Sequence, residues 1–156
     1  MQRVSTMPSP SLALALLSLG VCYASTDQPN FSGRWALDPT KSQDTNGAAV
    51  ELTIQDASGK IDYQRVVRER GGKEIKASFT CPTRGTWCKF DENGHLGKVS
   101  LWYDGSALMM AKEGGPSKDA TTERRMELSP DGKTLTVEFT NFSGSGKPQK
   151  LVFTKQ

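Results

Sequence analysis

The chain has 156 residues, of which 24% are charged, and its formal net charge is +3. Acidic and basic residues alternate along it without forming a basic stripe, which excludes a nucleic-acid-binding surface of the usual kind. Once an N-terminal leader is set aside, residues 25–156 suffice for one domain with its own core and are too few for two.

The leader has the three parts of a secretory signal peptide, over residues 1–24. Arg3 supplies a short positive region, residues 12–21 form an apolar run, and the run is followed by a segment that ends in the small residue Ala24. The run is too short to cross a bilayer, which takes about 20 apolar residues. An uncleaved membrane anchor is therefore the less favoured interpretation.

Cys22 offers a second alternative, because residues 19–22 resemble a bacterial lipobox and lipidation would anchor the protein there. Val21 stands where that pattern has a small residue. Cleavage after Ala24 is the preferred interpretation. It predicts a mature chain of residues 25–156 that is secreted or periplasmic, monomeric and without a transmembrane segment.

The predicted mature chain begins with a short polar segment, and Phe31-Ser32-Gly33-Arg34-Trp35 opens its first predicted strand. A Trp beside a Gly at this point can plug one end of a small barrel, because Gly lets the backbone bend closely while the indole fills space. Residues 38–47 then read as a loop, since Pro39 and Gly47 interrupt any periodicity.

From residue 50 onward, apolar residues recur with period two, the pattern of half-buried strands. The runs are 50–54, 61–67, 75–79, 87–90, 99–103, 107–111, 126–128, 135–139 and 151–153. Turn dipeptides such as Ser58-Gly59, Asn93-Gly94 and Asp131-Gly132 separate them. We expect an all-β domain, an antiparallel up-and-down meander of about eight to ten strands. A closed barrel is favoured over a sandwich because closure removes unpaired edges.

Two stretches carry a resemblance to known proteins. Phe31, Gly33 and Trp35 match the Gly-x-Trp pattern that lipocalins place on their first strand, although Ala36 and Asp38 depart from it. Residues 30–42 and 128–136 together are more similar to small, uncharacterised secreted bacterial proteins of lipocalin-like (calycin) type. Those proteins begin with a Phe-Ser-Gly-x-Trp segment and end with a Leu-Ser-Pro-Asp-Gly-Lys-Thr-Leu-Thr hairpin. The resemblance implies a lipocalin-like barrel and brings no catalytic residue.

Cys81 and Cys88 are the two cysteines of the predicted mature chain, and an even pair in an exported domain predicts a disulfide. Strands joined by so short a loop can bring the two Cα atoms within the ~5.5 Å that the bond needs. Such a staple would present Arg84 and Trp87 as a rigid recognition loop for a protein partner. The spacing lacks the Cys-x-x-Cys redox pattern. A zinc site would need four ligands, and only His95 could join the pair.

No constellation in the sequence indicates an enzyme. His95, the single histidine, lies beside a turn, and no motif supplies a nucleophile or carboxylate to work with it. The strand carboxylates lie opposite the apolar faces or at strand ends, where a solvated charge is the default. They are Glu51, Glu69, Glu74, Glu127 and Glu138. We therefore expect no catalytic residue, no cofactor and no metal.

The favoured hypothesis is a binding protein that holds a small apolar molecule inside the barrel. By strand parity, the residues expected to line the interior are Tyr63, Phe79, Tyr103, Met109 and Phe139. Parity leaves the inward face open where both faces are apolar, as at Leu108 and Met110. Two alternatives stay open. These side chains can simply fill a solid barrel, or the protein can bind a protein partner, as a hydrolase inhibitor or adhesion domain, through the loop from Cys81 to Cys88.

Overall fold

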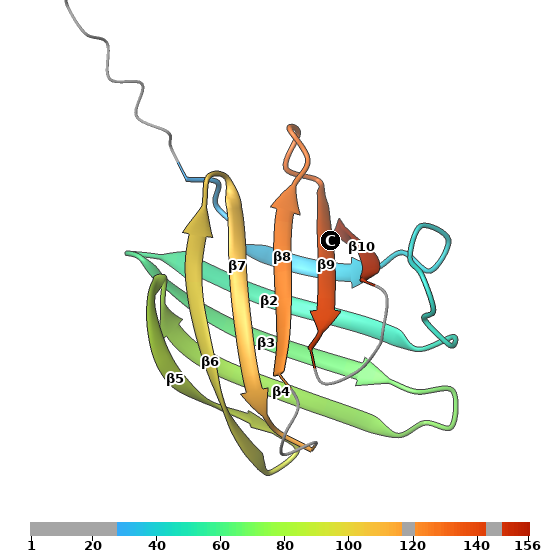
Figure 1. Ribbon diagram of the computed structural model, residues 1–156. Helices are drawn as coiled ribbons and strands as arrows, with labels where there is room; N and C mark the ends of the chain where they lie inside the picture. Colours follow the sequence, from blue (N-terminus) through green and yellow to red (C-terminus); the bar gives the residue numbers. More distant parts are fainter. Residues whose placement is uncertain (1–27, 117–120, 143–147) are drawn as a thin grey trace, which may run out of the picture.

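A computed structural model describes residues 28–116, 121–142 and 148–156. The predicted signal peptide, its cleavage site and Cys22 lie outside these residues. The described chain folds into ten strands and no helix (Figure 1). The strands are β1 (Gly33–Leu37), β2 (Ala49–Ala57), β3 (Lys60–Arg68), β4 (Glu74–Pro82), β5 (Arg84–Glu92), β6 (His95–Asp104), β7 (Ala107–Gly114), β8 (Thr121–Leu128), β9 (Thr134–Asn141) and β10 (Gln149–Lys155).

Each strand pairs antiparallel with the next one in sequence, and β1 also pairs with β10, so the sheet closes into a barrel. Tight turns make this succession possible. At Ser58-Gly59 and Asn93-Gly94 both residues have positive φ, the conformation of the two-residue hairpin turns that match strand twist. The predicted all-β, up-and-down closed barrel is confirmed.

One end of the barrel is closed by the residues around Trp35. Phe31 and Trp35 are almost fully buried, and the indole Nε1 of Trp35 donates a hydrogen bond to the carbonyl oxygen of Phe31 at 3.1 Å. Lys155 covers the other side of the indole, with its Nζ 5.2 Å from the ring centroid. The core of this half is apolar and buried; it includes Ile54, Ile61, Leu101, Leu108 and Leu135.

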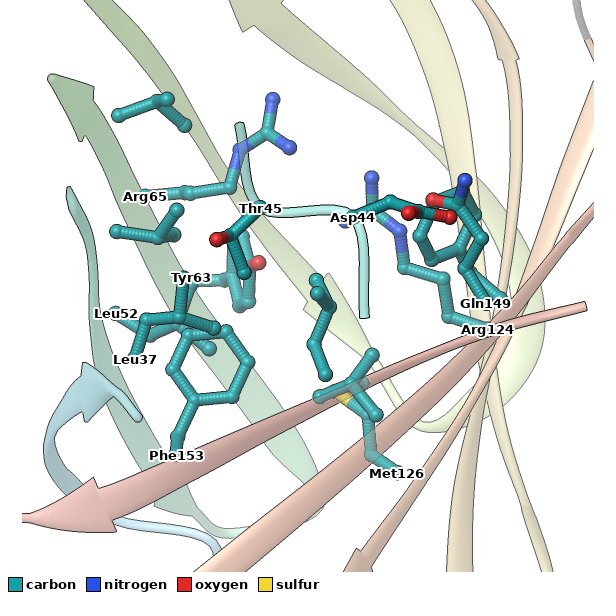
Figure 2. Close-up of a pocket in the computed structure, with 15 residues that line it drawn as sticks. Leu37, Asp44, Thr45, Leu52, Tyr63, Arg65, Arg124, Met126, Gln149 and Phe153 are labelled. Carbon is teal, nitrogen blue, oxygen red and sulfur yellow. The ribbon is translucent and has the colours of Figure 1, made fainter. Parts of the chain in front are cut away.

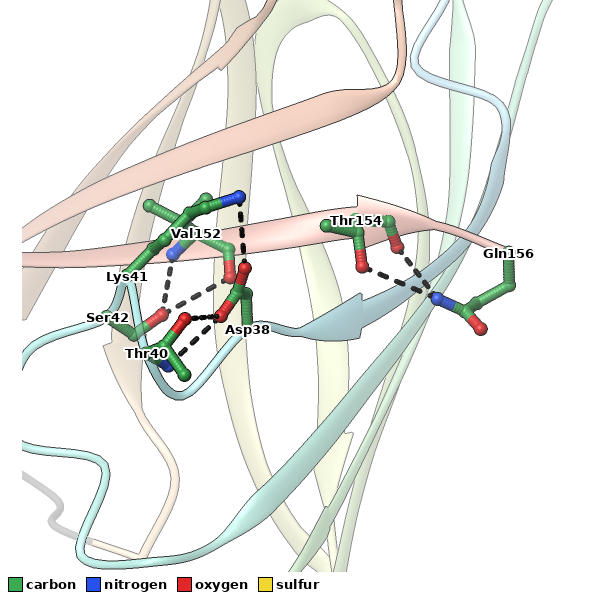
Figure 3. A network of polar contacts seen from close by, with 7 residues as sticks. All are labelled: Asp38, Thr40, Lys41, Ser42, Val152, Thr154 and Gln156. Carbon is green, nitrogen blue, oxygen red and sulfur yellow. Dashed lines mark hydrogen bonds and ion pairs between the residues drawn. The ribbon is translucent and has the colours of Figure 1, made fainter.

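The opposite end is open, and there the wall beside β10 is made by a loop instead of a strand. Beyond Leu37, the chain continues along β10 through backbone hydrogen bonds from Asp38 and Gln43 to the carbonyls of Val152 and Lys150. Ser42 adds a two-way contact, because its hydroxyl accepts from the amide of Val152 at 2.9 Å and donates to its carbonyl at 3.2 Å (Figure 3). This loop therefore satisfies the free edge of β10.

The same loop is stiffened at its base by Asp38. Its carboxylate accepts hydrogen bonds from the amide and hydroxyl of Thr40, at 3.0 and 2.6 Å, and pairs with Lys41 at 3.2 Å (Figure 3). These contacts, the hydrogen bond from Thr40 foremost, lower the pKa of Asp38. The loop at the open end is thus held by side-chain hydrogen bonds at both Asp38 and Ser42.

The predicted disulfide is present. Strands β4 and β5 pair at Ala77–Glu92 and Ser78–Asp91, and the same register sets Cys81 directly opposite Cys88. Their Cα atoms are 5.7 Å apart and their sulfurs are bonded. The staple joins the two strands near the closed end of the barrel.

Candidate ligand-binding site

The open half of the barrel contains a cavity of about 290 Å³ (Figure 2). This volume lies just below the usual range for small-molecule sites, about 300–1,000 Å³. Apolar side chains form much of the wall; they include Leu37, Val50, Leu52, Met126, Val137, Leu151 and Phe153. Asp44 and Thr45, from the loop between β1 and β2, also reach this cavity. The barrel is therefore hollow in one half and solid in the other.

Glu92 is buried next to Arg65, a residue of the cavity wall, with only 7% of its surface exposed. Its Oε1 accepts a hydrogen bond from Nη2 of Arg65 at 2.6 Å, and its Oε2 accepts one from Nζ of Lys112 at 2.5 Å. The ammonium of Lys112 also lies 4.6 Å from the centroid of the Phe90 ring. Both oxygens of the one carboxylate are thus engaged by cations from β3 and β7.

Burial raises the pKa of Glu92, but the hydrogen bond from Lys112 and the charges of Arg65 and Lys112 outweigh it, so the pKa lies below its usual value. Glu92 is consequently ionised at neutral pH. The pKa of Lys112 is also lowered, mainly by burial and further by the nearby charges of Arg124 and Arg65. The neighbouring positive charges thus add to the effect of burial on the pKa of Lys112 and oppose the effect of burial on the pKa of Glu92.

Arg124, on β8, is the third cation of this interior. It lines the 290 Å³ cavity together with Arg65 (Figure 2). Its guanidinium contacts the sulfur of Met110 at 4.0 Å, and within the residues that the structure describes no carboxylate forms an ion pair with it. Burial lowers its pKa, although arginine remains charged under all ordinary conditions.

Arg65, Lys112 and Arg124 lie around one buried carboxylate, that of Glu92, and Arg124 forms no ion pair within the described residues. Asp44, from the loop between β1 and β2, is a second carboxylate on the wall of the cavity, and no ion pair joins it to these cations. An oxoanion in the cavity would give Arg124 an acceptor. The Nε of Arg65 also lacks a hydrogen-bond partner but is itself fully buried.

Of the residues that the sequence nominated for the interior, Tyr63 and Phe139 line the large cavity. Phe79 lines a smaller void of about 20 Å³ that shares Tyr63, Arg65 and Arg124 with it, and the rings of Phe79 and Tyr63 stack with centroids 4.8 Å apart. Tyr103 lies away from both, where its hydroxyl donates to Asp56 at 3.0 Å.

Met109 lies on the other side of the wall. It is opposite Trp102 on β6 and Arg125 on β8, and its sulfur is 3.8 Å from the guanidinium of Arg125. Met110 takes the inward position on β7, in register with Arg124. Both faces of β7 are apolar, so parity alone does not identify the inward face. The prediction of Met109 followed the set Ala107, Met109 and Ala111, which is the outer face.

Four charged residues of the barrel interior were not predicted from the sequence. Each continues the parity of an inward apolar residue: Arg65 follows Tyr63, Glu92 follows Phe90, Lys112 follows Met110, and Arg124 precedes Met126. The available signal was a charge at an inward position of an otherwise apolar face.

Arg84 and Trp87 lie outside the cavity on β5, and Trp87 is 46% exposed. Arg84 stands opposite Trp102 of β6, and the register between these strands shifts between Arg84 and Trp87. The stapled segment therefore faces solvent and is separate from the charged interior. Among the described residues there is no group of three or more His, Cys, Asp or Glu side chains placed to hold a metal ion, and no helix with the length and hydropathy of a membrane span.

The fold and cavity define a closed, up-and-down antiparallel β-barrel that is hollow at one end. No protein-family model matches the chain, and comparison with curated proteins finds no match. In structure, the chain is similar to secretory abundant heat soluble protein 4 from Ramazzottius varieornatus, with a TM-score of 0.58 at 16% identity over 83% of this chain and 97% of that one. A de novo designed fluorescence-activating β-barrel gives a TM-score of 0.46 at 12% identity, over 81% and 94% of the two chains. At these identities the likeness to the first protein establishes the fold alone.

Proposed function

We propose that this protein is an exported binding protein that holds a small amphipathic molecule in the open half of its barrel. The apolar part of the ligand would lie against the aliphatic and aromatic wall, with Tyr63 and Phe139 among its contacts. The observation that carries the proposal is Arg124, a cation that lines the cavity without a carboxylate partner among the described residues. A ligand with an anionic group would supply that partner.

Three further features support this proposal. The sequence predicts a signal peptide at residues 1–24 and a secreted or periplasmic mature chain, and the disulfide fits an oxidising compartment. The cavity counts against the alternative in which side chains fill the barrel completely. We propose no catalytic role, since Glu92 is engaged in ion pairs with Arg65 and Lys112, and Arg124 is a cation suited to binding an anion.

Fluorescence titration with the apolar anion 1-anilinonaphthalene-8-sulfonate, followed by displacement with decanoate and with decanol, tests the proposal. We expect saturable binding of one probe per chain and displacement by decanoate at lower concentration than by decanol. Arg124→Gln should weaken decanoate binding at least tenfold and decanol binding much less, because only the carboxylate uses the guanidinium.

Arg125→Gln is the matched control. Arg125 is the next residue on the same strand but faces outward, where it pairs with Asp104 and Glu127 at 2.9 and 2.8 Å. Arg125→Gln removes the same charge as Arg124→Gln and should leave the affinities for decanoate and decanol unchanged. The proposal is refuted if none of the three compounds binds saturably.

The exposed Trp87 favours a second candidate, a protein-binding surface formed by Arg84 and Trp87 beside the disulfide. Partners captured by the protein should then be lost when Arg84→Ala and Trp87→Ala are combined. Retention of every captured partner by the double variant would remove this candidate. The two functions use opposite sides of the barrel wall and can be tested independently.

A further inference from the structure

We infer that Glu92 restricts the ligand's polar end to a single negative charge, so that the cavity takes carboxylates in preference to phosphate monoesters. This inference rests on the proposed function and deepens it. It starts from the position of Glu92, an ionised group fixed in the wall beside the cation that would receive the ligand.

The two oxygens of Glu92 already use two of the three interior cations. Arg65 and Lys112 direct their hydrogen bonds at Glu92, at 2.6 and 2.5 Å. Of the three, only Arg124, which lines the cavity and forms no ion pair within the described residues, remains available to an incoming group. That donor set matches one carboxylate better than a doubly charged phosphate.

Glu92 is also held in place. Its carboxylate is tied to β3 through Arg65 and to β7 through Lys112, and the residue is buried. A ligand that displaced this carboxylate would have to break both ion pairs. The negative charge is therefore a standing feature of the site.

The fixed charge has a selective effect. A second negative charge on the ligand would be repelled by Glu92 at short range in a partly dry interior, where unit charges a few ångströms apart interact strongly enough to change affinity tenfold or more. A ligand with a single negative charge is attracted by Arg124 and meets half of the repulsion from Glu92 that a doubly charged ligand meets. Removing the charge of Glu92 would free both Arg65 and Lys112 and should benefit a dianion more than a monoanion.

The experiment compares decanoate with decyl phosphate at pH 8, where the phosphate carries close to two charges because its second pKa is about 6. The wild-type protein should bind decanoate more tightly. Glu92→Gln should shift the affinity ratio toward decyl phosphate by at least tenfold. Glu138→Gln removes the same charge from the exposed outer face of β9 and should shift the ratio less than twofold.

Lys112→Gln provides a second variant that moves the ratio the other way. It leaves Glu92 with one cation fewer, so decyl phosphate should lose more affinity than decanoate. If Glu92→Gln does not fold, Lys112→Gln still tests the inference. An affinity ratio that is unchanged in Lys112→Gln, or that shifts toward decyl phosphate, contradicts it. Wild-type protein that prefers the phosphate, or a Glu92→Gln shift no larger than that of Glu138→Gln, overturns it. Failure of both compounds and of the naphthalene probe to bind would instead refute the proposed function.

Discussion

The guanidinium of Arg65 donates a hydrogen bond to the carboxylate of Glu92 at 2.6 Å, linking β3 to β5 past the intervening strand β4. Both groups face the barrel interior, and Lys112 completes the link to β7. Buried ion pairs of this kind seldom add net stability over an apolar core, because two charges must leave water. Under the proposed function, these ion pairs hold positive charge close to the cavity.

Replacement of Glu92 should reveal the cost of leaving its buried partner cations unpaired. Glu92→Gln leaves Arg65 and Lys112 without their ion-pair partner, and we expect a loss of about 2–4 kcal/mol in the free energy of unfolding at pH 7. Urea denaturation measures it. The control, Glu138→Gln on the exposed face of β9, should change stability by less than about 0.5 kcal/mol.

The same pair predicts a pH dependence. The pKa of Glu92 is lower in the folded protein than its ordinary value of about 4.3. Its contribution is therefore complete above that value and is lost as the pH falls through the lower folded pKa. The difference in stability between the wild type and Glu92→Gln should be full at pH 7 and should shrink below about pH 4. A constant difference down to pH 2 would contradict the prediction.

Gly97 should be sensitive to a single methyl group. A Cβ there would be 2.1 Å from Cε1 of Phe90 and 2.5 Å from the carbonyl oxygen of Glu113, and that backbone atom cannot move aside easily. We expect Gly97→Ala to cost about 2 kcal/mol, the range of overpacked cores, by urea denaturation. At Gly71 a Cβ meets nothing within 4 Å, so Gly71→Ala should have little effect. Equal stability of the two variants would show that Phe90 does not occupy this space.

Ser42 should control the edge of β10. Its hydroxyl both accepts from and donates to the backbone of Val152, so Ser42→Ala removes two contacts and leaves that amide without its acceptor. We expect a local loss of about 1 kcal/mol, seen as roughly fivefold faster hydrogen exchange at Val152. Ser78→Ala, on the exposed face of β4, serves as the control. Unchanged exchange would mean that the loop does not protect this edge.

Reduction of the disulfide should weaken the barrel without dismantling it. The bond closes a short loop between residues separated by 7 positions. Chain-entropy arguments give such a loop about 2 kcal/mol of stabilisation. The protein should therefore unfold at lower urea concentration in dithiothreitol, and the variant combining Cys81→Ala and Cys88→Ala should be indifferent to the reductant. A wild type that is equally stable in both conditions would place the two thiols apart in solution.

Much of the fold was predictable because its determinants are local. Period-two runs set the strands, and paired turn residues such as Asn93-Gly94 set the hairpins, so an up-and-down meander followed from neighbours in sequence. The disulfide was predictable for the same reason, since Cys81 and Cys88 lie on consecutive strands. The wall beside β10 was not, because the hydrogen bonds of Ser42 to Val152 join the two ends of the chain.

The motif Phe31-Ser32-Gly33-Arg34-Trp35 and the regular turns thus indicated by themselves a succession of antiparallel strands, since each hairpin needs only its immediate neighbours. The tertiary structure closed that succession by pairing β1 with β10, and it alone decided what the barrel contains. Arg65, Glu92, Lys112 and Arg124 come from four different strands, and only the curvature of the closed sheet brings them together in the interior. Likewise, Met110 faces inward and Met109 outward because of the register with β6 and β8, which a strand with two apolar faces cannot specify alone.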